Sequence, residues 1–269
     1  MTVSVVIITK NEAATIGRCV AAAKRITDDV IVMDNGSTDE TTDIALNYGC
    51  RVYQEKWYGY GTNKNHGAEL ARHNWILSLD ADEIPDDELI TTIQNLQYEA
   101  DNIIYDIRFR AYFGVKQVRF GTWGRDHRIR LFNRNYTGWS EPLVHENLIK
   151  PADAIIKKLP GLVHHYSGKS PEQYRAKTMY YARLNARNYL REGKKSTAIK
   201  LYLAPLFHFL KDYIFLLGIL DGKRGWLIAT IMAQYTRAKY QYLKQETEQK
   251  GNNYYASENL LVEYQNHLH

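Results

Sequence analysis

The sequence predicts an α/β fold in which a mostly parallel sheet is flanked by helices, followed by a helical extension. Residues 3–8, 29–33 and 75–79 form apolar, largely β-branched runs that are typical of buried parallel strands. Helical patterns and a short strand-like run at residues 51–54 lie between them. Alternation of strands and helices indicates a parallel sheet with helical crossovers. A chain of 269 residues is long enough for one sizeable core and a smaller appendage.

The early helices carry start signals of their own. Asn11 is expected as the N-cap of a helix whose apolar positions include Ile16 and Val20. Ser37 with Glu40 three residues later fits a capping box for a helix that ends near residue 49. Residues 62–73 then predict a third helix directly before the strand at 75–79.

Beyond residue 83 the pattern becomes less regular. Pro85 is expected to open a helix that runs to about residue 96. Residues 103–149 alternate apolar and polar side chains and predict shorter strands, including an antiparallel pair. Residues 161–166 predict one more strand. The first domain is therefore expected to span residues 1–168, with its pattern changing near residue 100.

The last third of the chain predicts helices. Ser170, Pro171 and Gln173 form a cap for a long helix that ends near residue 192. Residues 197–220 and 225–245 predict two more helices, so that residues 169–245 form a helical extension and residues 246–269 a polar tail. Apolar runs in this region reach about half of the roughly 20 residues that a membrane span requires, and Lys211 and Asp212 interrupt them. These helices are expected to lie on the inner face of a membrane, to pack on the first domain or to form a subunit interface, with a homodimer left open.

Charge is unevenly distributed along the chain. Residues 1–156 carry 17 Lys and Arg against 22 Asp and Glu, whereas residues 157–250 carry 18 against 6. A basic C-terminal third indicates an anionic partner, with a solvated basic face as the alternative. Cys19 and Cys50 are too few for a disulfide framework and are expected to be reduced. No basic segment with a cleavage pattern precedes the first apolar run, so a cytoplasmic location is expected.

The clearest chemical signal is the sequence Asp80-Ala81-Asp82-Glu83. A buried strand delivers these carboxylates to its C-terminal end, which is where open α/β sheets bind ligands. In an extended chain residues i and i+2 point the same way, so Asp80 and Asp82 are expected to face one ion, with Mg²⁺ or Mn²⁺ preferred. The alternative is an acidic cluster at a helix start, to which Glu83 would belong.

Other strand ends carry further candidates, each with a structural alternative. Asp34 ends the second strand beside Thr9 and would accept hydrogen bonds from a base or ribose, unless it closes an Asx turn. Lys64 would meet a phosphate, or it is a solvated lysine. His165 would complete the metal site or touch the diphosphate, or it is a hydrogen-bonded structural histidine.

Four segments in the first hundred residues resemble the family 2 glycosyltransferases with the GT-A fold, in order and at similar spacing. They are residues 5–12 (VVIITKNE), 32–40 (VMDNGSTDE), 61–65 (GTNKN) and 79–83 (LDADE). The resemblance implies that residues 1–168 form a catalytic domain, with a nucleotide-sugar half at 1–100 and an acceptor half at 101–168. It implies contacts to the nucleotide-sugar donor from Thr9, Asn11, Glu12, Asp34, Lys64, Asp80 and Ala81. It also implies that Asp82 leads the binding of the metal. Lys64 stands where the family usually has arginine, which keeps the charge but loses the bidentate fork.

The later chain resembles the lipopolysaccharide-core glucosyltransferases of this family more loosely. The segments that carry this resemblance are residues 128–132 (RIRLF), 144–146 (VHE), 164–166 (HHY) and 220–222 (LDG). The resemblance implies an acceptor in an envelope glycan or glycolipid, and nucleic acid is not expected as a partner.

The family is inverting, so a base must take the proton of the acceptor hydroxyl while metal and basic groups stabilise the departing diphosphate. Glu146 is the first candidate for this base, followed by Glu141 and Asp126, and loop ion pairs with nearby arginines are the alternative role. The predicted function is transfer of a sugar from a nucleotide diphosphate, most simply UDP, to a hydroxyl. A sugar-1-phosphate nucleotidyltransferase would need a Gly-rich basic loop in place of Thr9-Lys-Asn-Glu12. A non-catalytic glycan- or nucleotide-binding module is the remaining alternative.

Overall fold

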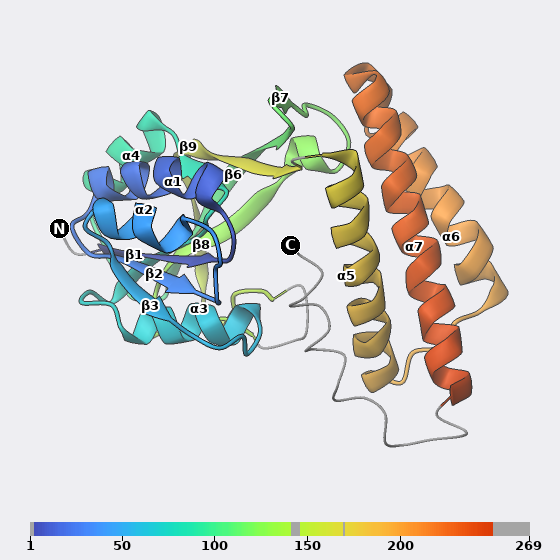
Figure 1. Ribbon diagram of the computed structural model, residues 1–269, viewed down its shortest axis with the longest axis horizontal. Coiled ribbons are helices and arrows are strands. Elements are labelled where there is room, and N and C mark those ends of the chain that lie inside the picture. Colours follow the sequence, from blue (N-terminus) through green and yellow to red (C-terminus); the bar gives the residue numbers. More distant parts are fainter. Residues whose placement is uncertain (1–2, 141–145, 169, 250–269) are drawn as a thin grey trace.

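A computed structural model describes residues 3–140, 146–168 and 170–249 of the chain (Figure 1). A nine-stranded sheet forms the centre of the first part, with strand order β3-β2-β1-β4-β8-β6-β9-β5 and β7 paired to β6. Three long helices, α5 to α7, stand beside this sheet as a separate bundle (Figure 1). The predicted α/β class with a C-terminal helical extension is confirmed.

The first half of the sheet is built from parallel strands joined by helices. β1 (Val3–Thr9), β2 (Val30–Asp34), β3 (Arg51–Gln54) and β4 (Trp75–Asp80) are mutually parallel along the order β3-β2-β1-β4. α1 (Ala13–Ile26), α2 (Thr41–Asn47) and α3 (Tyr60–Glu69) connect them. Each crossover carries the chain back to the start of the next strand, so all four strands end at one edge of the sheet.

The second half of the sheet is mixed. It contains β5 (Glu83–Pro85), β6 (Ile103–Phe113), β7 (Lys116–Gln117), β8 (His127–Asn133) and β9 (Ile155–Gly168), with α4 (Asp87–Gln94) and the short helix η1 (Trp123–Arg125) between them. β8 runs antiparallel to both β4 and β6, whereas β9 runs parallel to β6. The predicted antiparallel pair is present. The last strand is longer than residues 161–166, because β9 pairs with β6 from Ile155 onward.

One predicted helix start is wrong. Pro85 ends β5 instead of opening a helix, and Asp86 is the N-cap of α4, accepting a hydrogen bond from the Leu89 amide at 2.8 Å. Gly161 of β9 passes so close to this cap that a Cβ there would lie 2.2 Å from the Leu89 nitrogen. β9 and the start of α4 are thereby held against each other.

Side chains of the central strand β1 alternate between the two faces of the sheet, as a period of two requires. Val5 and Ile7 pack into the layer with Ile16 of α1, whereas Val6 and Ile8 pack into the layer with α3. Figure 1 shows α1, α2 and α4 over one face and α3 over the other. Burial on both faces explains why β1 is apolar at every position from Val5 to Ile8.

The helical extension comprises α5 (Pro171–Arg191), α6 (Ala198–Leu210), a π-helical turn η2 (Lys211–Phe215), a 3-10 helix η3 (Gly218–Asp221) and α7 (Lys223–Gln249). α7 packs against both α5 and α6. The predicted cap of α5 is present, since the Ser170 hydroxyl accepts a hydrogen bond from the Gln173 amide. α7 runs past residue 245, so residues 246–249 belong to this helix and not to a tail. No helix in the described parts of the chain is both long and apolar enough to cross a membrane.

Two buried carboxylates connect this bundle to the sheet. Asp221 accepts hydrogen bonds from the amides of Arg119 and Phe120, and Asp212 accepts from the amide and hydroxyl of Thr122 at 2.6 and 2.7 Å. The segment that they hold follows β7 and leads into β8. The stretch at residues 220–222 thus has a structural role, because Asp221 holds the loop between β7 and β8.

Candidate active site

The strand ends of the first half meet as predicted. Thr9 pairs in register with Asp34 on one side of β1, and Ile8 pairs with Asp80 on the other. The ends of β1, β2 and β4 therefore bring Thr9, Asp34 and Asp80 to the same edge. The Thr9 hydroxyl is buried and has no hydrogen-bond partner among the described residues.

The loops after β1 and β2 are tied to each other. Asn11 adopts a left-handed φ of 52°, and its Oδ1 accepts a hydrogen bond from the Thr38 amide at 2.8 Å. Asp34 is fully buried and accepts from the Gly36 amide and from the amide and hydroxyl of Ser37. The expected Asn11 cap and Ser37 capping box are therefore wrong, because these side chains bond across and within the loops.

Glu12, not Asn11, occupies the N-cap position of α1. Its backbone amide donates to the Thr41 hydroxyl at 2.8 Å, and its carboxylate accepts from the Thr15 hydroxyl at 2.7 Å. Thr9, Asn11, Glu12 and Asp34 thus border one rigid loop pair. Asp34 acts as the turn-closing residue that was the alternative reading of this position.

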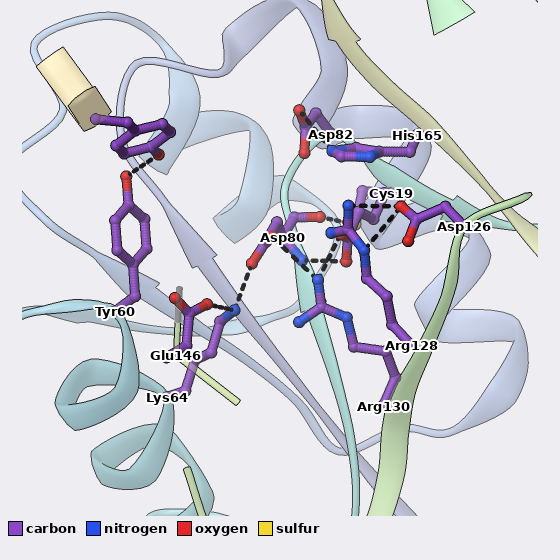
Figure 2. Close-up of polar contacts among 12 residues, drawn as sticks. Cys19, Tyr60, Lys64, Asp80, Asp82, Asp126, Arg128, Arg130, Glu146 and His165 are labelled. Carbon is purple, nitrogen blue, oxygen red and sulfur yellow. Dashed lines mark hydrogen bonds and ion pairs between the residues drawn. The ribbon is translucent and has the colours of Figure 1, made fainter. Parts of the chain in front are cut away.

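Asp80 and Asp82 do not share a partner. β4 ends at Asp80 and the chain turns there, so the i, i+2 rule of an extended strand does not apply. Figure 2 shows Asp80 beside Lys64 and Asp82 beside His165. The carboxylate of Asp82 lies 3.6 Å from Nε2 of His165. Ala81 lies between them, buried, and its amide donates to the Ile8 carbonyl.

The charges around the two aspartates keep both ionised. Burial raises the pKa of Asp82, but His165 and Lys177 together outweigh this effect and lower the pKa to about 2. Burial likewise opposes the lowering at Asp80, where Lys64 and then Arg130 hold the pKa of the carboxyl well below its usual range. Two carboxylates thus remain negatively charged at neutral pH.

A buried ion cluster lies directly beneath this motif. Glu83 is fully buried, accepts from the Asp80 amide at 3.0 Å and pairs with Arg130 at 2.6 Å and Arg128 at 3.2 Å. Arg130 also reaches Asp80 at 3.2 Å. Burial raises the pKa of Glu83, with Arg130 opposing it. Glu83 therefore does not act only as an acidic residue before a helix. It links the arginines of β8 to the backbone amide of Asp80.

Lys64 is not a solvated lysine, because its side chain is fully buried and bridges two carboxylates. Its Nζ lies 3.1 Å from Oδ1 of Asp80 and 2.7 Å from Oε1 of Glu146, and 4.6 Å from the ring centre of Trp139. Figure 2 shows Lys64 between Asp80 and Glu146. The structure thus brings the first base candidate next to the predicted metal motif.

The other two candidates for the base are Asp126 and Glu141. Asp126 is bound by Arg128 through Nε at 3.0 Å and Nη2 at 2.7 Å, so it takes part in the ion pair that was its alternative role. Glu141 lies outside the residues that the structure describes.

The helical bundle reaches the site, whereas the sequence predicted only that it could pack on the first domain. Tyr181 of α5 shares a hydrogen bond of 2.6 Å with Tyr60 at the start of α3. Lys177, one turn earlier on α5, has an accessible side chain. Desolvation lowers the pKa of Lys177, but the surrounding groups, Asp82 first among them, together outweigh this effect and raise it. The only signal in the sequence was the general basic character of this helix.

The described residues hold no group of three or more carboxylate, imidazole or thiol side chains in a metal-binding arrangement. Asp82 and His165 nevertheless form an oxygen and nitrogen pair, and Asp80 lies near them. Mg²⁺ is commonly held by one or two carboxylates, with substrate phosphates and water completing its shell. The donor set therefore fits a metal that binds together with a diphosphate.

Comparison with known proteins agrees with this architecture. The family model described as glycosyl transferase family 2 matches residues 4–156. An uncharacterized glycosyltransferase of Rickettsia typhi is 31% identical, over 96% of this chain and 92% of that protein. The lipopolysaccharide core biosynthesis glycosyltransferase LpsC of Rhizobium meliloti is 26% identical, over 78% of this chain and 80% of its own length.

Two solved structures are similar at low identity. Residues 1–349 of TarS from S. aureus match 95% of this chain and 93% of that chain at 18% identity and a TM-score of 0.45. The glucosyl-3-phosphoglycerate synthase of Mycobacterium tuberculosis, in complex with Mn²⁺ and UDP-glucose, matches 41% of this chain and 44% of that chain at 23% identity and a TM-score of 0.33. Because the family model covers more than half of the chain, and a relative above 30% identity covers nearly all of it, the protein belongs to glycosyl transferase family 2.

Proposed function

We propose that this enzyme transfers a sugar from a UDP-sugar to a hydroxyl of an envelope glycan or glycolipid, with inversion and with a divalent metal. The proposal rests on one observation: the side chains of Lys64, Asp80, Asp82 and Glu146 lie close together near the strand ends of a family 2 fold. The family assignment sets aside the nucleotidyltransferase and the non-catalytic module as alternatives.

The nucleotide lies along the loops after β1 and β2 in this proposal. Thr9 and the linked loops of Asn11, Glu12 and Asp34 border it. Asp82 and His165 would hold Mg²⁺ or Mn²⁺, and such an ion would supply positive charge to the leaving diphosphate. Lys177 from α5 supplies a further positive charge beside Asp82.

Lys64 links donor binding to the base. In the structure the ammonium group of Lys64 forms ion pairs with both Asp80 and Glu146. The Oε1 atom of Glu146 is thus occupied by an N–H···O bond of 2.7 Å. When a diphosphate enters, it competes for Lys64, and Glu146 is released to accept the proton of the acceptor hydroxyl. The acceptor oxygen then bonds to the anomeric carbon as the bond from that carbon to the diphosphate breaks.

The acceptor is proposed from two observations. LpsC, which is 26% identical, is named for lipopolysaccharide core biosynthesis. The C-terminal third is strongly basic, which suits an acceptor that carries phosphate or lies at an anionic surface. A place of action at the inner face of the cytoplasmic membrane would satisfy both.

A donor screen tests the proposal. The protein is incubated with each nucleotide sugar, with and without Mn²⁺, and the released nucleoside diphosphate is measured. We expect slow release that depends on the sugar nucleotide and the metal. Glu99→Gln serves as a matched control, because Glu99 pairs only with Lys157 among the described residues and lies away from the site. Failure of every nucleotide sugar with folded protein would refute the proposed reaction.

A further inference from the structure

The helix α6 and the segment after it present a broad apolar surface to solvent. Large hydrophobic side chains between residues 199 and 226 are 45–71% exposed. We call this set the outer face; it consists of Ile199, Tyr202, Leu203, Leu206, Phe207, Ile214, Phe215, Leu217, Ile219, Leu220 and Trp226. Scattered exposed apolar residues are ordinary, but these eleven fall within 28 consecutive positions of the chain, and such a concentration marks a candidate interaction site.

The outer face does not arise from loose packing of α6. The helix also contacts α7, where Phe209 meets the ring of Trp226 with ring centres 5.1 Å apart. Residues 199, 202, 203 and 206 follow the spacing of one helical face. Apart from the exposed Lys200 and His208, α6 carries apolar side chains both toward α7 and on its exposed side, which is the pattern of a helix with partners on both sides. α7 supplies one of these partners.

The charges around the outer face indicate what the second partner is. Residues 195–226 contain five Lys and Arg and two Asp. Both aspartates, Asp212 and Asp221, are buried and bound to the loop at 119–122. The charges left to solvent are consequently all positive. Lys200 lies three residues before Leu203, and Lys211 four after Phe207, so both flank the apolar stripe.

We propose that the outer face docks on an anionic lipid bilayer, with α6 lying in the plane of the interface. Lysines beside an apolar stripe place their stems along it and their charges among lipid headgroups. Tyr202 and Trp226 are of the types that concentrate at membrane interfaces. A symmetric contact between two copies would instead bring like positive charges together. This inference does not depend on the proposed reaction.

Vesicle co-sedimentation of the full chain tests the proposal, using phosphatidylcholine with and without phosphatidylglycerol at low and high salt. We expect binding to the anionic vesicles that salt weakens without abolishing, because salt screens only the charges. The triple variant Leu203→Gln, Phe207→Gln, Phe215→Gln should bind at least about tenfold more weakly. A control variant changes equally exposed apolar residues of the sheet domain: Leu46→Gln, Ile149→Gln and Ile156→Gln.

The control variant should bind like the original chain. The variant Lys200→Gln, Lys211→Gln, Lys223→Gln should lose about a hundredfold at low salt and most of the salt dependence. Full-length protein that stays in solution with anionic vesicles at low salt would overturn the proposal. So would equal loss in the control and outer-face variants. A dimer that the outer-face substitutions convert to a monomer, with no vesicle binding, would assign this surface to a second copy instead. Nucleotide release from the donor is measured in parallel, so that loss of binding is separated from loss of folding.

Discussion

Replacing Arg130 by methionine should destabilise the protein through Glu83. The two side chains are 4% and 0% exposed, and their Nη2 and Oε1 atoms are 2.6 Å apart. Removing one partner of a buried ion pair costs about 3–5 kcal/mol, because the other charge stays buried without compensation. Arg128 remains 3.2 Å from Glu83, which favours the lower end, about 3 kcal/mol. For a chain of this size that corresponds to a fall in Tm of about 6–12 °C.

The chain supplies a matched control on the same strand. Arg128→Met makes the same substitution two residues away, but the Arg128 side chain is 35% exposed and solvent screens its pairs. We expect a loss of about 1 kcal/mol there. The double variant Arg130→Met, Glu83→Gln should be more stable than Arg130→Met alone, since it removes the uncompensated charge.

The effect of Arg130→Met should also depend on pH. Burial already raises the pKa of Glu83 in the folded protein, and loss of Arg130 raises it further. A carboxyl whose pKa is raised by folding opposes folding once it is ionised, so stability is lost as pH rises. The deficit of the variant should therefore be larger at pH 8 than at pH 5. Urea unfolding followed by circular dichroism measures both. Equal losses for Arg130→Met and Arg128→Met, with no pH dependence, would refute this account of the buried cluster.

Three further changes test other parts of the site. Asp82→Asn should abolish Mn²⁺-dependent binding of the donor while the fold is kept, as measured by calorimetry; unchanged affinity would remove Asp82 from the metal site. Glu146→Gln should lower turnover by about 10²-fold or more with donor affinity nearly unchanged; near-normal turnover would pass the role of base to Glu141 or Asp126. Asp221→Leu should leave the amides of Arg119 and Phe120 without their acceptor and lower stability by about 2–4 kcal/mol, as measured by urea unfolding; a loss below about 1 kcal/mol would show that this carboxylate does not hold the loop.

The predictions of helix starts that proved wrong involve residues that bond or pair with distant segments of the chain. Asn11 and Ser37 have the residue types of helix caps, but each bonds to a loop that only the sheet brings near. Pro85 was expected at a helix start, but it pairs in β5 with Val163, a residue far along the chain. Side-chain spacing could not foresee these partners, because hydrogen bonds between distant segments depend on the tertiary fold.

The sequence by itself determined the parallel half of the sheet and the position of the site. Apolar runs at residues 3–8, 29–33 and 75–79 are buried on both faces, and parallel strands with helical crossovers must end at one edge. Thr9, Asp34 and Asp80 were therefore placed by the order of elements alone. Such patterns suffice because burial of apolar side chains acts on every residue of a strand.

Only the tertiary structure decided which charges meet. Lys64 reaches Glu146 across 82 positions of sequence, and Arg130 reaches Glu83 across 47. Asp82 lies beside His165, whereas Asp80 lies beside Lys64, because β4 ends at Asp80 and the chain turns before Asp82. The physical reason is that an ion pair depends on a few ångströms of separation and on burial. Both quantities are set by how β8, β9 and α5 pack against the first four strands, which no local pattern records.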